Sequence, residues 1–341
     1  MKKLLLFVGL FYCCTLQAEE FLKPQTSITL KKAYWSVARL SSNHLVLLAD
    51  DVVDLGEIKD STFQKTQHFA IQNRDPLRIF AYDCNADGQD EIVVSALERG
   101  VPASFVLSVA ADGKLSSLIP RIPWHLVVLE RNNQKILLGQ KSRSTQLFAG
   151  AVQKLSCDGK IVAHEKIALP RAINLFEFSF VKTEPLQIAE THDLEPLTLW
   201  EQDGKHFQKL WQSADRHGSK TAHVVELSDS NVLASTQENF LVPHGPLAFQ
   251  LKGKSYLAAS RSDWAFGGVV GRVPLIKSAQ LLFYVEEPEA GFDQSNVSKT
   301  IAGSVLDSIL DKTAQNGAQL LALIAPKGQP NKRLLLSYEL K

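Results

Sequence analysis

The chain contains 341 residues, with 37 Lys and Arg against 36 Asp and Glu, and 45% of its residues are hydrophobic. This apolar fraction is ordinary for a packed globular protein and excludes a largely disordered chain. The balanced charge shows no basic stripe, which argues against nucleic acid as a partner. The length allows one large domain or two small ones.

The N-terminus has the three parts of a secretory signal peptide. Lys2 and Lys3 supply the positive region, an apolar run follows, and Ala18 is the small residue at a cleavage point. We therefore expect a signal peptide over residues 1–18, a single mature domain over residues 19–341, and a periplasmic or secreted location.

Two other interpretations of this segment stay open. It could remain uncleaved as an N-terminal anchor, or Cys13 or Cys14 could carry a lipid. The lipid is disfavoured because the preceding Leu-Phe-Tyr is large, unlike the small residues of a bacterial lipoprotein signal. No later stretch approaches the roughly 20 apolar residues of a membrane helix. The mature chain is therefore predicted to lack a transmembrane segment.

Short β-rich runs dominate the rest of the chain, separated by turns rich in Gly, Asp, Asn and Pro. In chain order they include HLVLL (44–48), LRIFAY (77–82), EIVVSA (91–96), SFVLSVA (104–110), WHLVVLE (124–130), KILLG (135–139), LFEFSF (175–180), LQIAE (186–190), LAFQL (247–251) and LLFYV (281–285). Each has the length of a strand, so the pattern predicts an all-β fold.

The turn Asp-Gly-Lys recurs at Asp112, Asp158 and Asp203, a spacing of about 46 residues, with a degenerate Lys-Gly-Lys copy at 252–254. Asp-Gly between β-runs favours a hairpin because both positions tolerate positive φ. Each period holds about four strands, which is typical of a β-propeller blade. The mature length predicts seven blades. The alternative is a β-sandwich in which the turn spacing is accidental.

One segment near the C-terminus has helical periodicity. Val305, Leu306, Ile309 and Leu310 fall on one face of a helix. The pattern predicts a short helical insertion at 301–314 in a closing region that fits the repeat poorly.

The turn after LRIFAY concentrates oxygen-bearing groups in DCNADGQDE. Asp83, Asn85 and Asp87 alternate, so a curling loop can direct their side chains inward. Gln89 can offer its main-chain carbonyl, and Glu91 can close the site. Only a hard cation binds so many oxygens, and Ca²⁺ accepts roughly six to eight at flexible geometry.

The pattern Asp-x-Asn-x-Asp-Gly-x-x-Glu followed by Ile-Val-Val resembles the calcium loop of FG-GAP/VCBS repeats. These repeats build the integrin-α-type β-propeller and many secreted bacterial propellers, and their loop joins the first two strands of a blade. The resemblance implies one Ca²⁺ held by the side chains of Asp83, Asn85, Asp87 and Glu91 and by the carbonyl of Gln89. The chain would be a degenerate member, because the equivalent turns of other repeats carry no such ligand set.

Two residues depart from the family pattern. Ala86 stands where Gly is usual, and Glu91 where Asp is frequent. The longer Glu side chain can still reach the ion. A bound Ca²⁺ would be structural, because it would fix the turn and offset repulsion between carboxylates. The alternative is a solvated acidic turn without metal.

Two cysteines, Cys84 and Cys157, remain after signal removal. In the blade arrangement their turns emerge on the same face of the ring, so a disulfide is possible. Their radial separation could also exceed the Cα reach of about 7 Å. The sequence leaves a disulfide and two separate thiols both open.

No nucleophile elbow, HExxH, phosphate loop or dinucleotide fingerprint is present. His164-Glu165 and His192-Asp193 are isolated pairs, interpreted as surface or satisfied core residues. The sequence favours a monomeric, calcium-stabilised propeller that acts as a binding or assembly scaffold for an unknown protein or glycan. The alternative is a polysaccharide lyase or hydrolase whose site lies in the central channel and leaves no local motif.

Overall fold

The structure, a computed structural model, describes residues 21–340 except 111, 143–146, 172, 193–194, 218–219, 228–237, 271–272, 288–290 and 313–316. Every helix or strand assigned in this part of the chain is a β-strand. The expected signal peptide, residues 1–18, lies outside the described residues.

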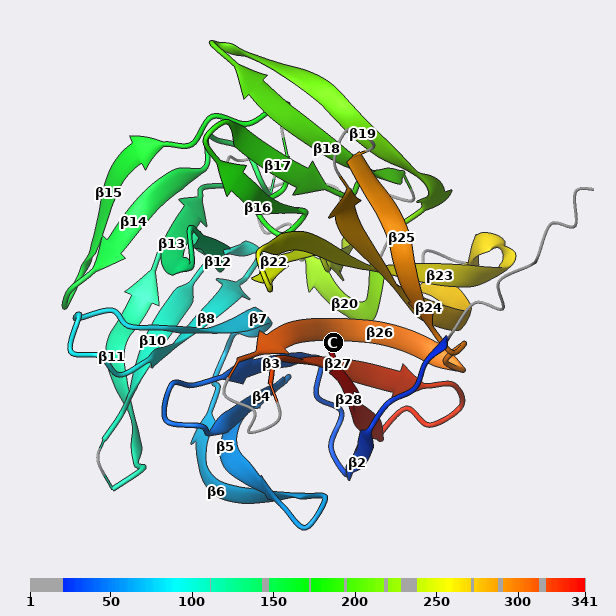
Figure 1. Ribbon diagram of the computed structural model, residues 1–341. Coiled ribbons are helices and arrows are strands. Elements are labelled where there is room, and N and C mark those ends of the chain that lie inside the picture. Colours follow the sequence, from blue (N-terminus) through cyan, green and yellow to red (C-terminus); the bar gives the residue numbers. More distant parts are fainter. Residues whose placement is uncertain are drawn as a thin grey trace, which may run out of the picture.

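Six sheets of four or five strands surround a common centre, so the predicted all-β propeller is confirmed (Figure 1). Blade 1 contains β3 (Ser36–Arg39), β4 (Leu45–Ala49), β5 (Val52–Lys59) and β6 (Thr62–Ala70). Blade 2 contains β7 (Asp75–Tyr82), β8 (Glu91–Glu98), β10 (Ser104–Val109) and β11 (Leu115–Ile122), with β9 (Val101–Pro102) beside β8. Blade 3 contains β12 (His125–Arg131), β13 (Gln134–Gln140), β14 (Gln153–Cys157) and β15 (Ile161–Lys166). Blade 4 contains β16 (Phe178–Thr183), β17 (Leu186–Glu190), β18 (Pro196–Asp203) and β19 (His206–Arg216).

The last third of the chain is less regular. A two-stranded sheet, β20 (Lys220–Leu227) and β21 (Glu238–Pro243), precedes blade 5. Blade 5 contains β22 (Leu247–Leu251), β23 (Lys254–Val270), β24 (Val273–Glu287) and β25 (Gly291–Ser298), with β1 (Phe21–Leu22) parallel to β25. Blade 6 contains β26 (Gly303–Asp311), β27 (Gln319–Pro326), β28 (Arg333–Glu339) and β2 (Thr26–Leu30).

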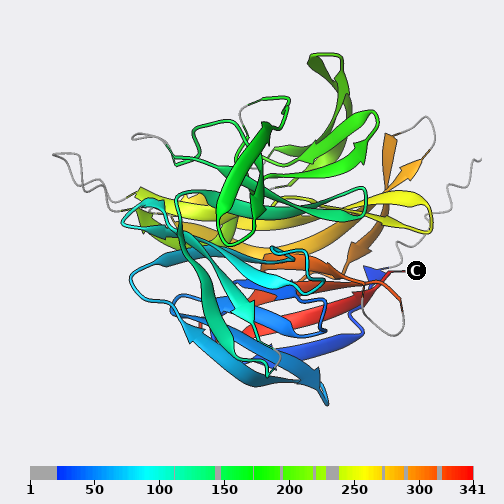
Figure 2. The same ribbon diagram turned by 90° about the vertical axis from the view of Figure 1, so that its left-hand side faces the viewer.

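The prediction of seven blades is wrong, because two segments use more chain than the repeat allows. β23 and β24 are 17 and 15 residues long, and Figure 2 shows these strands crossing much of the molecule. The sheet of β20 and β21 adds further residues without forming a blade. The Lys-Gly-Lys turn at 252–254 is also not equivalent to the Asp-Gly-Lys turns, because it joins the first two strands of blade 5.

The helical insertion at 301–314 is also wrong, because β26 occupies Gly303–Asp311 as the innermost strand of blade 6. Val305 and Leu306 are neighbours in sequence, yet both side chains are only 2% exposed. A strand buried on both faces loses the alternation of apolar and polar residues, so its apolar run can imitate helical periodicity.

The three Asp-Gly-Lys turns form hairpins within their blades, as predicted. They join the third and fourth strands of blades 2, 3 and 4. Gly113, Gly159 and Gly204 have φ angles of 81°, 63° and 61°. These left-handed angles explain why glycine recurs at this point of the repeat.

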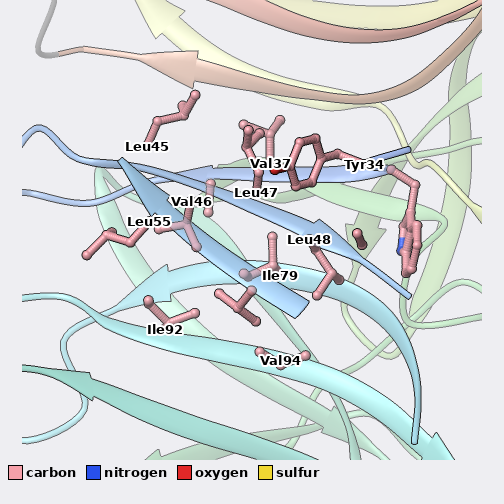
Figure 3. Close-up of a cluster of buried hydrophobic side chains, with 14 of the residues drawn as sticks. Tyr34, Val37, Leu45, Val46, Leu47, Leu48, Leu55, Ile79, Ile92 and Val94 are labelled. Carbon is pink, nitrogen blue, oxygen red and sulfur yellow. The ribbon is translucent and has the colours of Figure 1, made fainter. Parts of the chain in front are cut away.

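Aliphatic side chains fill the space between blades 1 and 2 (Figure 3). The side chains of Leu45, Leu47 and Leu48 are fully buried, and Ile79 and Ile92 approach from blade 2 within the same cluster. Outer strands such as β6 and β15 are mostly exposed. Burial therefore falls from the centre of the ring to its rim.

Candidate functional site

The predicted calcium loop connects β7 to β8 in blade 2, as the FG-GAP/VCBS resemblance implied. The chain reverses sharply at Ala86 and Gly88, whose φ angles are 59° and 87°. The second value falls on a glycine, which adopts it without a Cβ penalty. Ala86 also adopts the left-handed conformation, at the position where FG-GAP/VCBS repeats usually have glycine.

Main-chain N–H groups orient the oxygen side chains of this loop. The two oxygens of Asp83 accept the N–H groups of Asp87 (3.2 Å) and Gly88 (2.9 Å). Asn85 Oδ1 accepts the N–H of Asp87 at 3.0 Å, and Asp87 Oδ1 accepts the N–H of Gln89 at 2.8 Å. The three alternating side chains are therefore turned toward the loop's own backbone.

Glu91 lies at the base of the loop and is 5% exposed. Its Oε2 accepts the N–H of Cys84 at 2.7 Å. Burial raises the pKa of the Glu91 carboxyl above its ordinary value, and the negative charges of Asp87 and Asp83 raise it further. The three carboxylates therefore repel one another, and a cation among them would relieve that repulsion.

The donor set fits the chemistry of Ca²⁺, because all five predicted ligand groups offer oxygen. Within the described residues, however, no three His, Cys, Asp or Glu side chains are close enough together to form a metal-binding group. Asp83, Asp87 and Glu91 thus share one loop without converging on a single point. The calcium site stays a prediction.

Cys84 and Cys157 form a disulfide, with their Cα atoms 4.9 Å apart. Cys84 lies inside the acidic loop, and Cys157 is the last residue of β14 in blade 3. The two residues are 8% and 1% exposed and pack with Trp124 and Leu155. The disulfide ties the acidic loop to the neighbouring blade, which decides between the alternatives that the sequence left open.

A groove with a volume of about 300 Å³ lies beside the acidic loop, between blades 1 and 2. One wall comes from blade 1, from Ser41, Ser42, His44, Thr66 and Gln67. The other comes from blade 2, from Gln89, Asp90, Val109, Ala110, Asp112 and Gly113. The end of the acidic loop is therefore part of the groove wall.

Asp90 joins this wall to both neighbouring blades. Its Oδ2 accepts the N–H of Ser41 at 2.7 Å, and its own N–H donates to Ser41 Oγ at 3.2 Å. Lys135 of blade 3 lies 2.8 Å from its Oδ1. The lysine compensates the charge of this 8%-exposed residue.

The centre of the ring holds a smaller cavity of about 130 Å³, and the innermost strand of every blade or the segment before it contributes to the lining. Most of the lining side chains are apolar, among them Val37, Phe80, Val128, Phe178 and Ile309. This volume is below the roughly 300–1,000 Å³ of typical ligand sites.

Asp307 is the focus of a buried polar cluster at this cavity. Its carboxylate accepts hydrogen bonds from Ser36 Oγ (2.5 Å) and from the N–H of Val37 (3.0 Å), and it forms an ion pair with Arg78. The guanidinium of Arg78 also donates to the carbonyl of Pro243 at 2.9 Å. The cluster connects blade 6 with blades 1 and 2 and with the segment before blade 5.

Ser308, His244 and Asp307 are in contact but do not form a nucleophilic triad. Ser308 Oγ and Asp307 Oδ1 approach the same nitrogen, Nε2 of His244, at 3.0 and 3.5 Å. A triad needs the nucleophile and the acid on opposite ring nitrogens. Burial, assisted by the charge of Arg78, lowers the pKa of His244 to about 4. The ring is therefore neutral at pH 7, and the cluster acts as a clamp between blades.

The two His-acid pairs noted in the sequence make ordinary local contacts. His164 lies on the exposed strand β15, and its Nε2 is 2.8 Å from Oγ of Ser156 on β14. His192 Nδ1 lies 3.0 Å from Glu177 Oε2, and Asp193 lies outside the described residues. Sequence analysis did not single out Asp307, although a lone acid in the apolar run SVLDSIL is a signal that could have found it.

These features define a six-bladed β-propeller in which β2 completes blade 6. No family model matches the chain, and no curated protein matches it. The resemblance to FG-GAP/VCBS repeats therefore rests on the loop pattern alone. Within the described residues, the structure contains no helix with the length and apolarity of a membrane span.

Solved structures resemble the chain over most of its length. A protein from Lactobacillus plantarum is 12% identical with a TM-score of 0.44, and the match covers 89% of this chain and 88% of that one. A Thermus thermophilus protein described as an oxidoreductase (glucose dehydrogenase) is 10% identical, with a TM-score of 0.48 and coverage of 93% and 99%. The N-terminal domain of Nup159 is 10% identical, with a TM-score of 0.39 and coverage of 94% and 98%. Similarities at this level carry no information on activity or ligand.

Proposed function

We propose that this protein is a periplasmic or secreted β-propeller of the FG-GAP/VCBS type that serves as a binding scaffold for a protein or glycan and holds one structural Ca²⁺ in its blade 2 loop. The signal-like N-terminus and the Cys84–Cys157 disulfide support an oxidising compartment outside the cytoplasm. The oxygen-rich loop supports the ion.

One observation carries the choice of a scaffold over an enzyme. The ionisable groups at the central cavity are already committed to one another, since the Asp307 carboxylate contacts Arg78, Ser36 and a main-chain N–H. The cavity of about 130 Å³ is too small to hold a polysaccharide chain between a catalytic acid and a catalytic base. A larger groove of about 300 Å³ lies between blades 1 and 2 and is lined in part by loop residues, and surface loops commonly carry binding residues.

The experiment compares binding with cleavage. The mature chain, residues 19–341, is incubated with a panel of polysaccharides and envelope proteins. Retention is measured by co-sedimentation or crosslinking, and cleavage by release of reducing ends or unsaturated products. The scaffold proposal expects retention of a partner without product. Release of product would overturn it, and loss of that product in a His244→Gln variant that keeps its native circular dichroism would establish the channel enzyme.

A further inference from the structure

We propose that the groove between blades 1 and 2 is a binding site for a neutral saccharide unit. This inference rests on the proposed scaffold function and assigns its ligand surface and ligand class. The groove volume of about 300 Å³ lies at the lower end of the range for small-molecule sites. It therefore suits one or two sugar rings rather than a folded partner.

Two residues with primary amide side chains line the groove from opposite walls. Gln67 comes from β6 of blade 1, and Gln89 comes from the end of the acidic loop in blade 2. Within the described part of the chain, neither side-chain amide has a protein hydrogen-bond partner, whereas Ser41 and Thr66 already have one. Each amide offers a donor and an acceptor side by side, which matches the paired donor and acceptor character of vicinal hydroxyl groups.

The remaining lining favours the same ligand. Val109 and Ala110 give a small apolar surface against which the C–H face of a sugar ring can pack. Asp112 supplies a carboxylate at the rim, one oxygen of which accepts the N–H of Lys114 at 3.0 Å. Its second oxygen can accept from a ligand hydroxyl as a charge-assisted hydrogen bond.

The charge of the groove argues against an anionic ligand. Neither wall includes a lysine or arginine among its described lining residues, and Lys135 is committed to Asp90. Asp112 would repel a phosphate, a sulfate or an acidic sugar. The groove therefore combines hydrogen-bonding capacity with a weak negative potential, which selects neutral polyhydroxyl ligands.

The test uses an array of immobilised neutral oligosaccharides, with sulfated and sialylated oligosaccharides as charged counterparts, probed with the mature chain in the presence of Ca²⁺. Calorimetry then measures the affinity of a neutral hit. The Gln67→Ala/Gln89→Ala variant should bind about tenfold or more weakly, because it loses two sets of hydrogen bonds. Gln89→Ala leaves the main-chain carbonyl, so the predicted calcium ligand is kept. Gln208→Ala, on the exposed face of β19 in blade 4, is the matched control and should bind like the native chain.

Three results would overturn the groove site. They are no neutral saccharide bound at millimolar concentration, a preference for the charged oligosaccharides, or unchanged affinity in the double amide variant. A saccharide that still binds the double variant would leave the scaffold proposal intact and place its site elsewhere. Cleavage of a bound saccharide would refute the scaffold proposal itself, whatever the two amides contribute.

Discussion

Removing the charge of Asp307 should destabilise the propeller more strongly than almost any surface change. The Asp307 side chain is 2% exposed, and that of its partner Arg78 is 11% exposed. Asp307→Asn keeps the shape and one acceptor oxygen but leaves the guanidinium without a carboxylate. Breaking a buried pair in this way costs about 3–5 kcal/mol of the free energy of unfolding.

Two further variants separate the charge effect from general damage. Arg78→Met combined with Asp307→Asn removes both charges, so the double variant should be more stable than Asp307→Asn alone. Glu287→Gln breaks the ion pair with Lys254, in which the side chains are 36% and 54% exposed. An exposed pair of this kind contributes only about 0–1 kcal/mol.

The assay is equilibrium unfolding in urea, followed by Trp fluorescence and circular dichroism, with the free energy of unfolding taken from the linear dependence on urea. The reasoning is refuted if Asp307→Asn loses no more stability than Glu287→Gln. It is also refuted if the double variant is less stable than Asp307→Asn, because the cost would then not come from an uncompensated charge.

Three other predictions concern the loop, the disulfide and pH. Ca²⁺ at about 100 times its dissociation constant should add about 2.7 kcal/mol to the free energy of unfolding. A chelator should have no effect on the stability of Asp87→Ala. If a chelator leaves the unfolding midpoint of the native chain unchanged, the calcium proposal is wrong. The Cys84→Ala/Cys157→Ala variant should lose about 4 kcal/mol, because the disulfide closes 73 residues of chain; alkylation of both thiols in the denatured, unreduced protein would contradict this. Burial lowers the pKa of His125 to about 4, below the ordinary value of about 6.5. As pH falls, the unfolded chain therefore binds a proton at this histidine before the folded chain does. The free energy of unfolding should decrease between these two pKa values, by about 2 kcal/mol at pH 5. His125→Gln should flatten the pH dependence of the urea midpoint, and an unchanged slope would argue against a buried neutral imidazole.

The fold class could be predicted from the sequence because its signal is local. The Asp-Gly turns need positive φ, and that requirement leaves a mark at Gly113, Gly159 and Gly204 wherever a blade repeats. The blade number could not be predicted in the same way. The hairpin of β23 and β24 changes the length of one unit without changing any turn.

The candidate sites also differ in how well the sequence could predict them, because only a contiguous site leaves a local signal. The acidic loop is contiguous, so its oxygen pattern can be read directly from the residues between Asp83 and Glu91. The polar clamp is not contiguous, because Arg78 and Asp307 are 229 residues apart and meet only when the ring forms. The groove was missed because Gln67 and Gln89 come from different blades, and the acidic-loop motif assigns a role only to the main-chain carbonyl of Gln89.

The pairing of β2 with β28 determines the order in which the molecule can be completed. Thr26 pairs with Ser337, and the flanking Gln25 and Glu339 are 314 residues apart. During synthesis from the N-terminus, β2 therefore lacks its pairing strand until β28 has been made. Blade 6 can therefore be completed only after β28 (Arg333–Glu339) has been made, and a chain truncated before β28 would lack the strand that pairs with β2. The pairing of β2 with β28 thus completes blade 6, and formation of the complete propeller requires both strands.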